Sequence, residues 1–312
     1  MAKKTDKTAN IDPDVTIIGK GSPYVTKSKP YIIEDGACKG ADFKKVVIKD
    51  GVTTIGSEAF ADCTSLTSVV IPDSVTEIGE CAFLGCTGLT SVVIPDRVTI
   101  IGGSAFSGTG LTSVVIPDGV IMIEQGAFCD CTGLTSVVIP GSVMEIGRES
   151  FWGCSSLTSV VIPDSVKRIG MKAFRDCTGL MSVIIPDSVT GIESDAFRGC
   201  TSLSSVEIPG SVTEMEMNSF MDCTSLTSIG IHDGVKTIGC QAFYGCTGLT
   251  SVVIPKSVKK IGQSAFSGCT GLISVVIPKS VSSIAPGAFQ NCPKLKDVVI
   301  PKSTKVAPTA FD

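Results

Sequence analysis

Apolar and polar residues alternate in short runs that recur along almost the whole chain. The run LTSVVIP first ends at Pro72 and returns unchanged from Leu89, Leu111, Leu134, Leu157 and Leu249. In its first copy, Val69 and Ile71 alternate with Ser68 and Val70, which is the two-residue period of a β-strand. Pro72 ends the run because proline has no N–H to donate to a sheet. Each copy therefore predicts a short strand, with Leu, the first Val and Ile in the core and Thr, Ser and the second Val facing outward.

The residues after each strand predict a second, shorter element and a turn. Val75 and Ile78 lie three residues apart, which indicates a short extended or turn segment. Ala82, Phe83 and Cys86 have the spacing that places side chains on one face of a single helical turn. A Thr-Gly or Thr-Ser pair then turns the chain toward the next leucine.

These elements recur with an almost constant period. Nine of the eleven steps between the phenylalanines are 23 residues, and the steps into Phe128 and Phe311 are 22; the phenylalanines are Phe60, Phe83, Phe106, Phe128, Phe151, Phe174, Phe197, Phe220, Phe243, Phe266, Phe289 and Phe311. Such a period predicts a solenoid whose first strands form a parallel sheet spaced about 4.8 Å apart. We expect residues 43–312 to form about 12 repeats of 22–23 residues, and residues 1–42 to be a tail and capping segment. No dedicated cap follows Phe311, so association through that end is a hypothesis.

The pattern LxxVxIPxxVxxIGxxAFxxC resembles the BspA-type, or Treponema pallidum-type, leucine-rich repeat, roughly from Phe43 to Phe311. The resemblance implies an α/β leucine-rich-repeat solenoid, a β-dominated right-handed horseshoe. Its LxxVxI strands would form a parallel concave sheet, with short turns or single-turn helices on the convex side. Proteins of this family are typically surface or secreted proteins of bacteria and protists that act in adhesion and protein binding. The opening MAKKTDKTANIDPD shows no apolar segment of a secretory signal, so the compartment stays open.

Composition and charge narrow the classes of partner. The chain is 43% hydrophobic but only 5% aromatic, so its core must be aliphatic. A net charge of −4 excludes a globally basic nucleic-acid binder, and no apolar run approaches the roughly 18 residues of a membrane span. The charge is nevertheless segmented: residues 1–49 carry +4, residues 50–235 carry −15 and residues 236–312 carry +7. This distribution either steers a partner or favours head-to-tail association, or it consists of solvated loop charges that keep the solenoid soluble.

Cysteine lies three residues after most of the phenylalanines, at Cys63, Cys86, Cys131, Cys154, Cys177, Cys200, Cys223, Cys246, Cys269 and Cys292. Parallel Cβ vectors in neighbouring repeats do not suit a disulfide, so we expect buried, reduced thiols. Four cysteines outside this series are expected to be surface thiols: Cys38, Cys81, Cys129 and Cys240. The sequence Cys129-Asp-Cys131 has no second ligand cluster nearby, so neither a zinc site nor any other cofactor is predicted.

The outward positions of the first strand form the candidate binding surface on the concave face. It comprises Ser91, Val93, Ser113, Val115, Ser136, Val138, Ser159, Val161, Ile184, Glu207 and Gly230. Contiguous exposed apolar residues often mark interaction sites, although β-branched residues also simply favour sheets. Glu207 and Gly230 interrupt the valines and are the first positions to examine for specificity. Trp152 and His232 are candidate peripheral contacts, Trp152 at an exposed convex site and His232 at an exposed turn.

No arrangement of residues predicts catalysis. His232 is the only histidine, and no phosphate-binding glycine loop or HExxH motif occurs. We therefore expect a non-enzymatic protein-binding or adhesion module that binds a host protein or another copy of itself through the concave face. The alternative is a structural or self-associating surface protein whose Thr, Ser and Val positions match a repetitive ligand such as a glycan, ice or itself. Neither nucleic acid nor a membrane span is expected.

Overall fold

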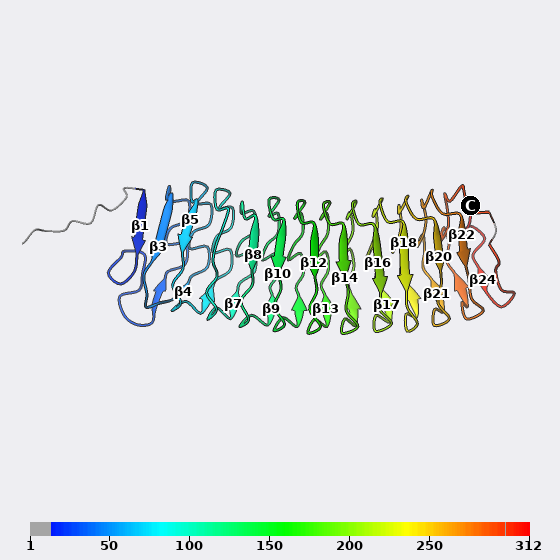
Figure 1. Cartoon of the computed structure of the whole chain (residues 1–312), viewed down its shortest axis with the longest axis horizontal. Helices are drawn as coiled ribbons and strands as arrows, with labels where there is room; N and C mark the ends of the chain where they lie inside the picture. Colours follow the sequence, from blue (N-terminus) through cyan, green and yellow to red (C-terminus); the bar gives the residue numbers. More distant parts are fainter. Residues whose placement is uncertain (1–13, 297) are drawn as a thin grey trace, which may run out of the picture.

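The computed structural model describes residues 14–296 and 298–312, which wind into a long stack of parallel β-strands (Figure 1). Most repeats contribute a first strand, a turn at the repeat proline, a second strand, and a turn-rich segment that leads to the next repeat. The first strands are β1 (Val15–Ile18), β3 (Lys45–Ile48), β5 (Ser68–Val70), β8 (Ser113–Val115), β10 (Ser136–Val138), β12 (Ser159–Val161), β14 (Ser182–Ile184), β16 (Ser205–Ile208), β18 (Ser228–Ile231), β20 (Ser251–Val253) and β22 (Ser274–Val276).

The second strands are shorter. They are β2 (Tyr31–Ile33), β4 (Val52–Ile55), β6 (Glu77–Ile78), β7 (Ile100–Ile101), β9 (Met122–Ile123), β11 (Glu145–Ile146), β13 (Arg168–Ile169), β15 (Gly191–Ile192), β17 (Glu214–Met215), β19 (Thr237–Ile238), β21 (Lys260–Ile261), β23 (Ser283–Ile284) and β24 (Lys305–Val306). The second strands from β9 to β24 form one continuous sheet, whereas β2, β4, β6 and β7 form a separate sheet. The predicted leucine-rich-repeat solenoid with its parallel sheets is confirmed.

Strand pairing keeps equivalent residues of successive repeats side by side. Val160 pairs with Val183, and Val161 pairs with Ile184, one repeat further along. At the N-terminal end, β1 pairs with β3 and β2 pairs with β4, so this segment extends both series of strands. Residues 1–13 of the expected tail and capping segment lie outside the described residues.

The single-turn helices allowed by the sequence pattern do not form anywhere in residues 14–296 or 298–312. Around Phe83 the backbone makes turn-type bonds, such as Cys86 N–H to the Phe83 carbonyl at 3.2 Å. The Phe83 N–H itself donates to the Ala105 carbonyl of the next repeat at 2.8 Å. Cys81 (φ 55°) and Gly85 (φ 69°) have left-handed backbone conformations, which an α-helix excludes. The segment therefore forms backbone hydrogen bonds to the neighbouring repeats of the stack and does not form an α-helical turn.

The core is a continuous column of phenylalanine rings surrounded by aliphatic side chains. From Phe60 to Phe311 each ring stacks on the next, with centroids 5.1–5.6 Å apart and ring planes within 10°. Leu, Val and Ile of the two strands bury their side chains against this column. The inward and outward positions predicted for the first strand are confirmed.

The cysteines that follow the phenylalanines line the same core as free thiols. Cys86 Sγ donates to the Phe60 carbonyl at 3.0 Å, and Cys177 Sγ donates to the Phe151 carbonyl at 3.1 Å. Cys38 was expected at the surface, and that expectation is wrong. It is buried because it stands where later repeats place phenylalanine, and its carbonyl accepts from Cys63 Sγ at 3.1 Å.

No helix long and apolar enough to traverse a bilayer is present in the described ranges.

Candidate functional site

The outward residues of the first strands form a flat, partly apolar face. We call the residues Val70, Val93, Val115, Val138, Val161 and Ile184 the valine stripe. All six are exposed, from 53% for Val70 to 81% for Val93. The strand register places Val138 beside Val115 and Ile184 beside Val161. These side chains are therefore aligned along the stack. Ser91, Ser113, Ser136 and Ser159 are exposed along one side of it. The structure thus places these predicted residues on one surface.

Three residues that depart from the repeat pattern meet at the end of the valine stripe. Glu207 pairs with Gly230 across neighbouring strands β16 and β18. The Glu207 carboxylate lies over Gly230 and reaches His232, with Glu207 Oε2 and His232 Nε2 2.9 Å apart. A Cβ atom on Gly230 would lie 1.7 Å from Glu207 Oε2, so glycine is what lets this carboxylate lie across the strand. The sequence marked Glu207 and Gly230 as an interruption but did not connect either of them to His232.

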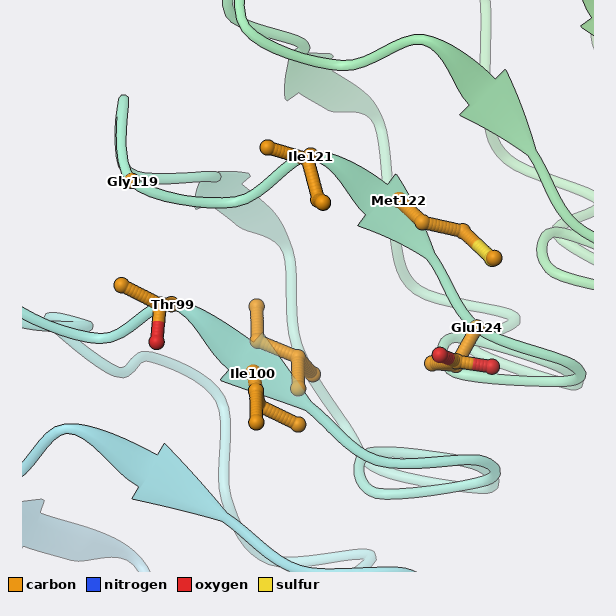
Figure 2. A pocket seen from close by; sticks show the side chains of 7 residues that line it. Thr99, Ile100, Gly119, Ile121, Met122 and Glu124 are labelled. Carbon is orange, nitrogen blue, oxygen red and sulfur yellow. The ribbon is translucent and has the colours of Figure 1, made fainter.

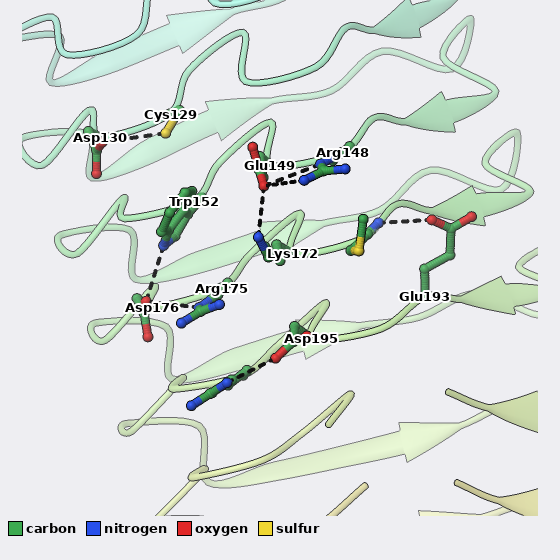
Figure 3. A network of polar contacts seen from close by, with 12 residues as sticks. Cys129, Asp130, Arg148, Glu149, Trp152, Lys172, Arg175, Asp176, Glu193 and Asp195 are labelled. Atoms are coloured by element: carbon green, nitrogen blue, oxygen red, sulfur yellow. Dashed lines mark hydrogen bonds and ion pairs between the residues drawn. The ribbon is translucent and has the colours of Figure 1, made fainter. Parts of the chain in front are cut away.

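Trp152 lies in a polar network on the turn-rich side of the stack (Figure 3). Its Nε1 donates to Asp176 Oδ2 at 3.1 Å, and Lys172 Nζ and Arg175 Cζ lie 5.4 and 5.5 Å from the ring centroid. Lys172 Nζ also bonds to Glu149 Oε1 at 3.0 Å. Trp152 was expected to be an exposed contact, but it is half-buried because the next repeat lays two cations over its ring. Its indole therefore joins two repeats together.

A hollow of about 310 Å³ opens between the second strands β7 and β9 (Figure 2). It is lined by Thr99, Ile100, Ile101, Gly119, Ile121, Met122 and Glu124. Ile100 is 48% exposed and Ile121 is 64% exposed, so the hollow and its rim are apolar. This feature was not predicted from the sequence.

The hollow exists because the hydrogen bonding between repeats is interrupted there. In most other repeats the equivalent bonds form, such as Thr99 N–H to the Thr76 carbonyl at 3.0 Å and Gly102 N–H to the Ile78 carbonyl at 2.8 Å. Within the described residues, the N–H groups of Ile121 and Glu124 make no such bond to the preceding repeat. The turn before this repeat is one residue short, FSGTGL in place of FLGCTGL, so the 22-residue step into Phe128 was the available signal.

Metal-binding residues do not gather on this surface. Over residues 14–296 and 298–312, no group of three or more His, Cys, Asp or Glu side chains has the arrangement of a metal site. The contact between Glu207 and His232 brings together two side chains of these types, and both are exposed.

Comparison with known proteins places the repeats in a family. The model of the BspA type leucine rich repeat region matches residues 31–158, 99–227, 144–269 and 213–312. A solved leucine-rich repeat protein from Bacteroides ovatus is 30% identical, with 93% of this chain and 91% of that chain covered and a TM-score of 0.57. A leucine rich cell surface protein from Faecalibacterium prausnitzii is 31% identical, with 96% and 89% covered and a TM-score of 0.58.

More distant structures share the fold. A leucine-rich repeat protein from Eubacterium ventriosum is 24% identical, with 96% of this chain and 90% of that chain covered and a TM-score of 0.57. A search of curated protein sequences found no match. The family model spans nearly all of the repeat region, and its pattern agrees with the strand, proline and phenylalanine positions described above. The chain belongs to the BspA-type leucine-rich repeat family.

Proposed function

We propose that this protein is a non-enzymatic binding module of the cell surface, and that a protein partner docks on the valine stripe. The observation that carries the proposal is the row of exposed β-branched side chains from Val70 to Ile184. A contiguous apolar row on a rigid sheet offers a partner area to bury at little cost in conformational entropy. The cell surface description of the Faecalibacterium prausnitzii relative supports the location.

The end of the stripe favours a protein partner over a repetitive lattice. Glycan, ice or another regular array would match serine and valine positions that continue unchanged along the stack. The charged Glu207 and the small Gly230 interrupt them, and Glu207 bonds to His232. A defined apolar patch bordered by a polar cluster is the arrangement typical of protein interfaces. The self-associating surface protein remains the second proposal, because another copy of this chain carries the same stripe.

The non-enzymatic part of the proposal rests on the surroundings of His232. Its ring bonds to the carboxylate of Glu207 on an exposed surface. No serine or cysteine of the described residues bonds to the ring nitrogens, so the arrangement of nucleophile and base used in covalent catalysis is missing there.

The proposal is tested with arginine substitutions in adjacent repeats. Val115→Arg with Val138→Arg places two charges in the middle of the valine stripe. The matched control, Thr190→Arg with Thr213→Arg, places two charges at exposed second-strand positions of adjacent repeats. Each purified protein is immobilised and exposed to surface extracts, and every retained protein is then purified and measured against all three baits.

We expect at least one purified partner to bind the wild type and the control equally and to bind the stripe variant at least about tenfold more weakly. If every partner binds all three baits with equal affinity, the valine stripe is not the docking surface. Light scattering of the wild type across a concentration series measures self-association. A concentration-dependent increase in mass that the stripe variant abolishes would support the second proposal.

A further inference from the structure

Seven lysines gather along one edge of the last repeats, and we call them the lysine ladder. They are Lys236, Lys256, Lys259, Lys260, Lys279, Lys302 and Lys305, and all are exposed. Lys256, Lys279 and Lys302 each follow the repeat proline in successive repeats. The others lie on or beside the adjoining second strands, where β19 and β21 are direct neighbours.

The backbone shows that these lysines lie in consecutive layers of the stack. Lys259 N–H donates to the Lys236 carbonyl at 2.8 Å, and Lys305 N–H donates to the Ser282 carbonyl at 2.9 Å. Thr237 pairs with Lys260 across β19 and β21. At about 4.8 Å per layer, the ladder forms a line of positive charge on the order of 15 Å long that follows the solenoid axis.

The charge of this line is not neutralised by the protein itself. None of the ion pairs among the described residues involves a lysine of the ladder. Several basic residues earlier in the chain are paired, as Arg168 is with Glu145 and Glu193, and Lys172 with Glu149. From 236 onward the sequence has nine lysines and two acidic residues, Asp297 and Asp312. The ladder thus projects a positive potential from an otherwise acidic protein.

Hydroxyl groups accompany the lysines. In earlier repeats the serine two residues after the proline donates to the preceding repeat, as Ser165 does to the Val143 carbonyl at 2.6 Å and Ser188 to the Val166 carbonyl at 2.8 Å. Ser257 and Ser280 are the equivalents beside Lys256 and Lys279, and their hydroxyls have no hydrogen-bond partner. Rotation about the Cα–Cβ bond would make these donors available to an anion held by the neighbouring lysines.

We propose that the lysine ladder binds a sulfated polysaccharide laid along the solenoid axis. Lysine ammonium groups act as point charges for sulfate, and a linear polyanion matches a linear arrangement of cations better than a compact anion does. Nucleic acid is disfavoured because Phe243, Phe266 and Phe289 are buried in the core, which leaves no aromatic platform among the lysines for a base. A lipid surface is disfavoured because the described residues from 236 onward form short strands and turns and include no amphipathic helix of the kind that lies in a membrane interface.

The test uses fluorescently labelled heparin as the sulfated probe in 0.15 M salt. The variant Lys256→Gln, Lys279→Gln and Lys302→Gln removes three charges from the ladder. The control Lys27→Gln, Lys29→Gln and Lys49→Gln removes three exposed lysines at the opposite end. Both variants therefore have the same net charge, and circular dichroism confirms that both are folded.

We expect the wild type and the control to bind heparin with similar affinity, and the ladder variant to bind at least about tenfold more weakly with a shallower dependence on salt. Equal weakening of the two variants, or no binding by the wild type, overturns the proposal. Desulfated heparin should not bind. Tighter binding to duplex DNA or to phosphatidylserine vesicles than to heparin overturns the assignment to a polysaccharide.

Discussion

Two residues after each phenylalanine of the column from Phe60 to Phe289, the chain adopts a left-handed backbone conformation that only a few residue types tolerate. Asp130 has φ 55° there, Gly153 has φ 73° in the next repeat, and Asp176 has φ 57° in the one after. Asp, Asn and Gly are the residues that visit this region most readily. The aspartate also reaches over its neighbour, because a Cβ atom on Gly153 would lie 2.3 Å from Asp130 Oδ1. Glycine at 153 therefore suits the left-handed backbone and also leaves room for the side chain of the preceding repeat.

Replacing Gly153 with alanine should destabilise the protein by about 2 kcal/mol, because the new methyl group meets the Asp130 carboxylate and strains a left-handed residue. Gly141→Ala is the matched control, since a Cβ atom there has no atom within 4 Å and its φ is not positive. Urea unfolding followed by circular dichroism measures both. Equal midpoints for the two variants would refute the role given to Gly153.

At the scale of the element, identical sequence does not give identical structure. The run LTSVVIP forms strands β5, β8, β10, β12 and β20, but residues 89–95 carry the same seven letters and form no strand. The difference comes from the next repeat, which is displaced because its preceding turn lacks one residue. Strand formation in a solenoid depends on a neighbour in register, so a local pattern alone cannot predict it.

Restoring the missing residue should close the hollow between β7 and β9. Changing FSGTGL at 106–111 to FSGCTGL replaces Thr109 with Cys and inserts a threonine, which recreates the 23-residue period. We expect the amides of Ile121 and Glu124 to bond to the preceding repeat and to exchange with solvent more slowly. The free energy of unfolding should increase by about 2 kcal/mol for two recovered hydrogen bonds. Hydrogen exchange measured by mass spectrometry checks this, and unchanged exchange at both amides would contradict the explanation.

The sequence allowed the strands and their inward and outward positions to be predicted, because each depends on spacing within one repeat. The stacked column of phenylalanines was not predicted, since the low aromatic content indicated an aliphatic core. The sequence left open whether the segment after the second strand forms short turns or a single-turn helix. The spacing of Ala82, Phe83 and Cys86 fits a helical turn, but left-handed residues on either side exclude one. The contacts of Trp152 with Lys172 and of His232 with Glu207 join residues 20 and 25 positions apart, and a pattern read within one repeat does not show them.

Across the whole molecule, the thiols couple stability to alkaline pH. Burial raises the pKa of Cys131 to about 11 and that of Cys223 to about 12, and it also raises the pKa values of Cys154, Cys200 and Cys246. An unfolded thiol ionises near pH 8.5 to 9. Above that pH the unfolded state releases protons that the folded state retains, so stability is complete below about pH 8.5 and falls as the pH rises toward the folded pKa values.

We therefore expect the free energy of unfolding to fall above pH 9 by about 1.4 kcal/mol per pH unit for each thiol whose pKa is raised by burial in the folded protein. Urea unfolding between pH 8 and pH 11 measures the slope. Cys223→Ala isolates one thiol, because it should reduce the slope by that amount and leaves every other side chain unchanged. A variant whose slope equals that of the wild type would show that Cys223 does not contribute.

The alternation of aspartate and glycine beside the phenylalanine column also limits how such a chain can change length by recombination. Aspartates alternate with glycines from Asp130 to Gly245, and Gly85 is followed by Gly108, so two glycines are tolerated as neighbours. Loss of the single repeat that carries Gly153 would bring Asp130 next to Asp176, two carboxylates in one confined position. Loss of that repeat together with the following one would instead place Asp130 next to Gly199, which repeats an arrangement already present. In this region the stack can therefore gain or lose repeats in pairs without creating that conflict.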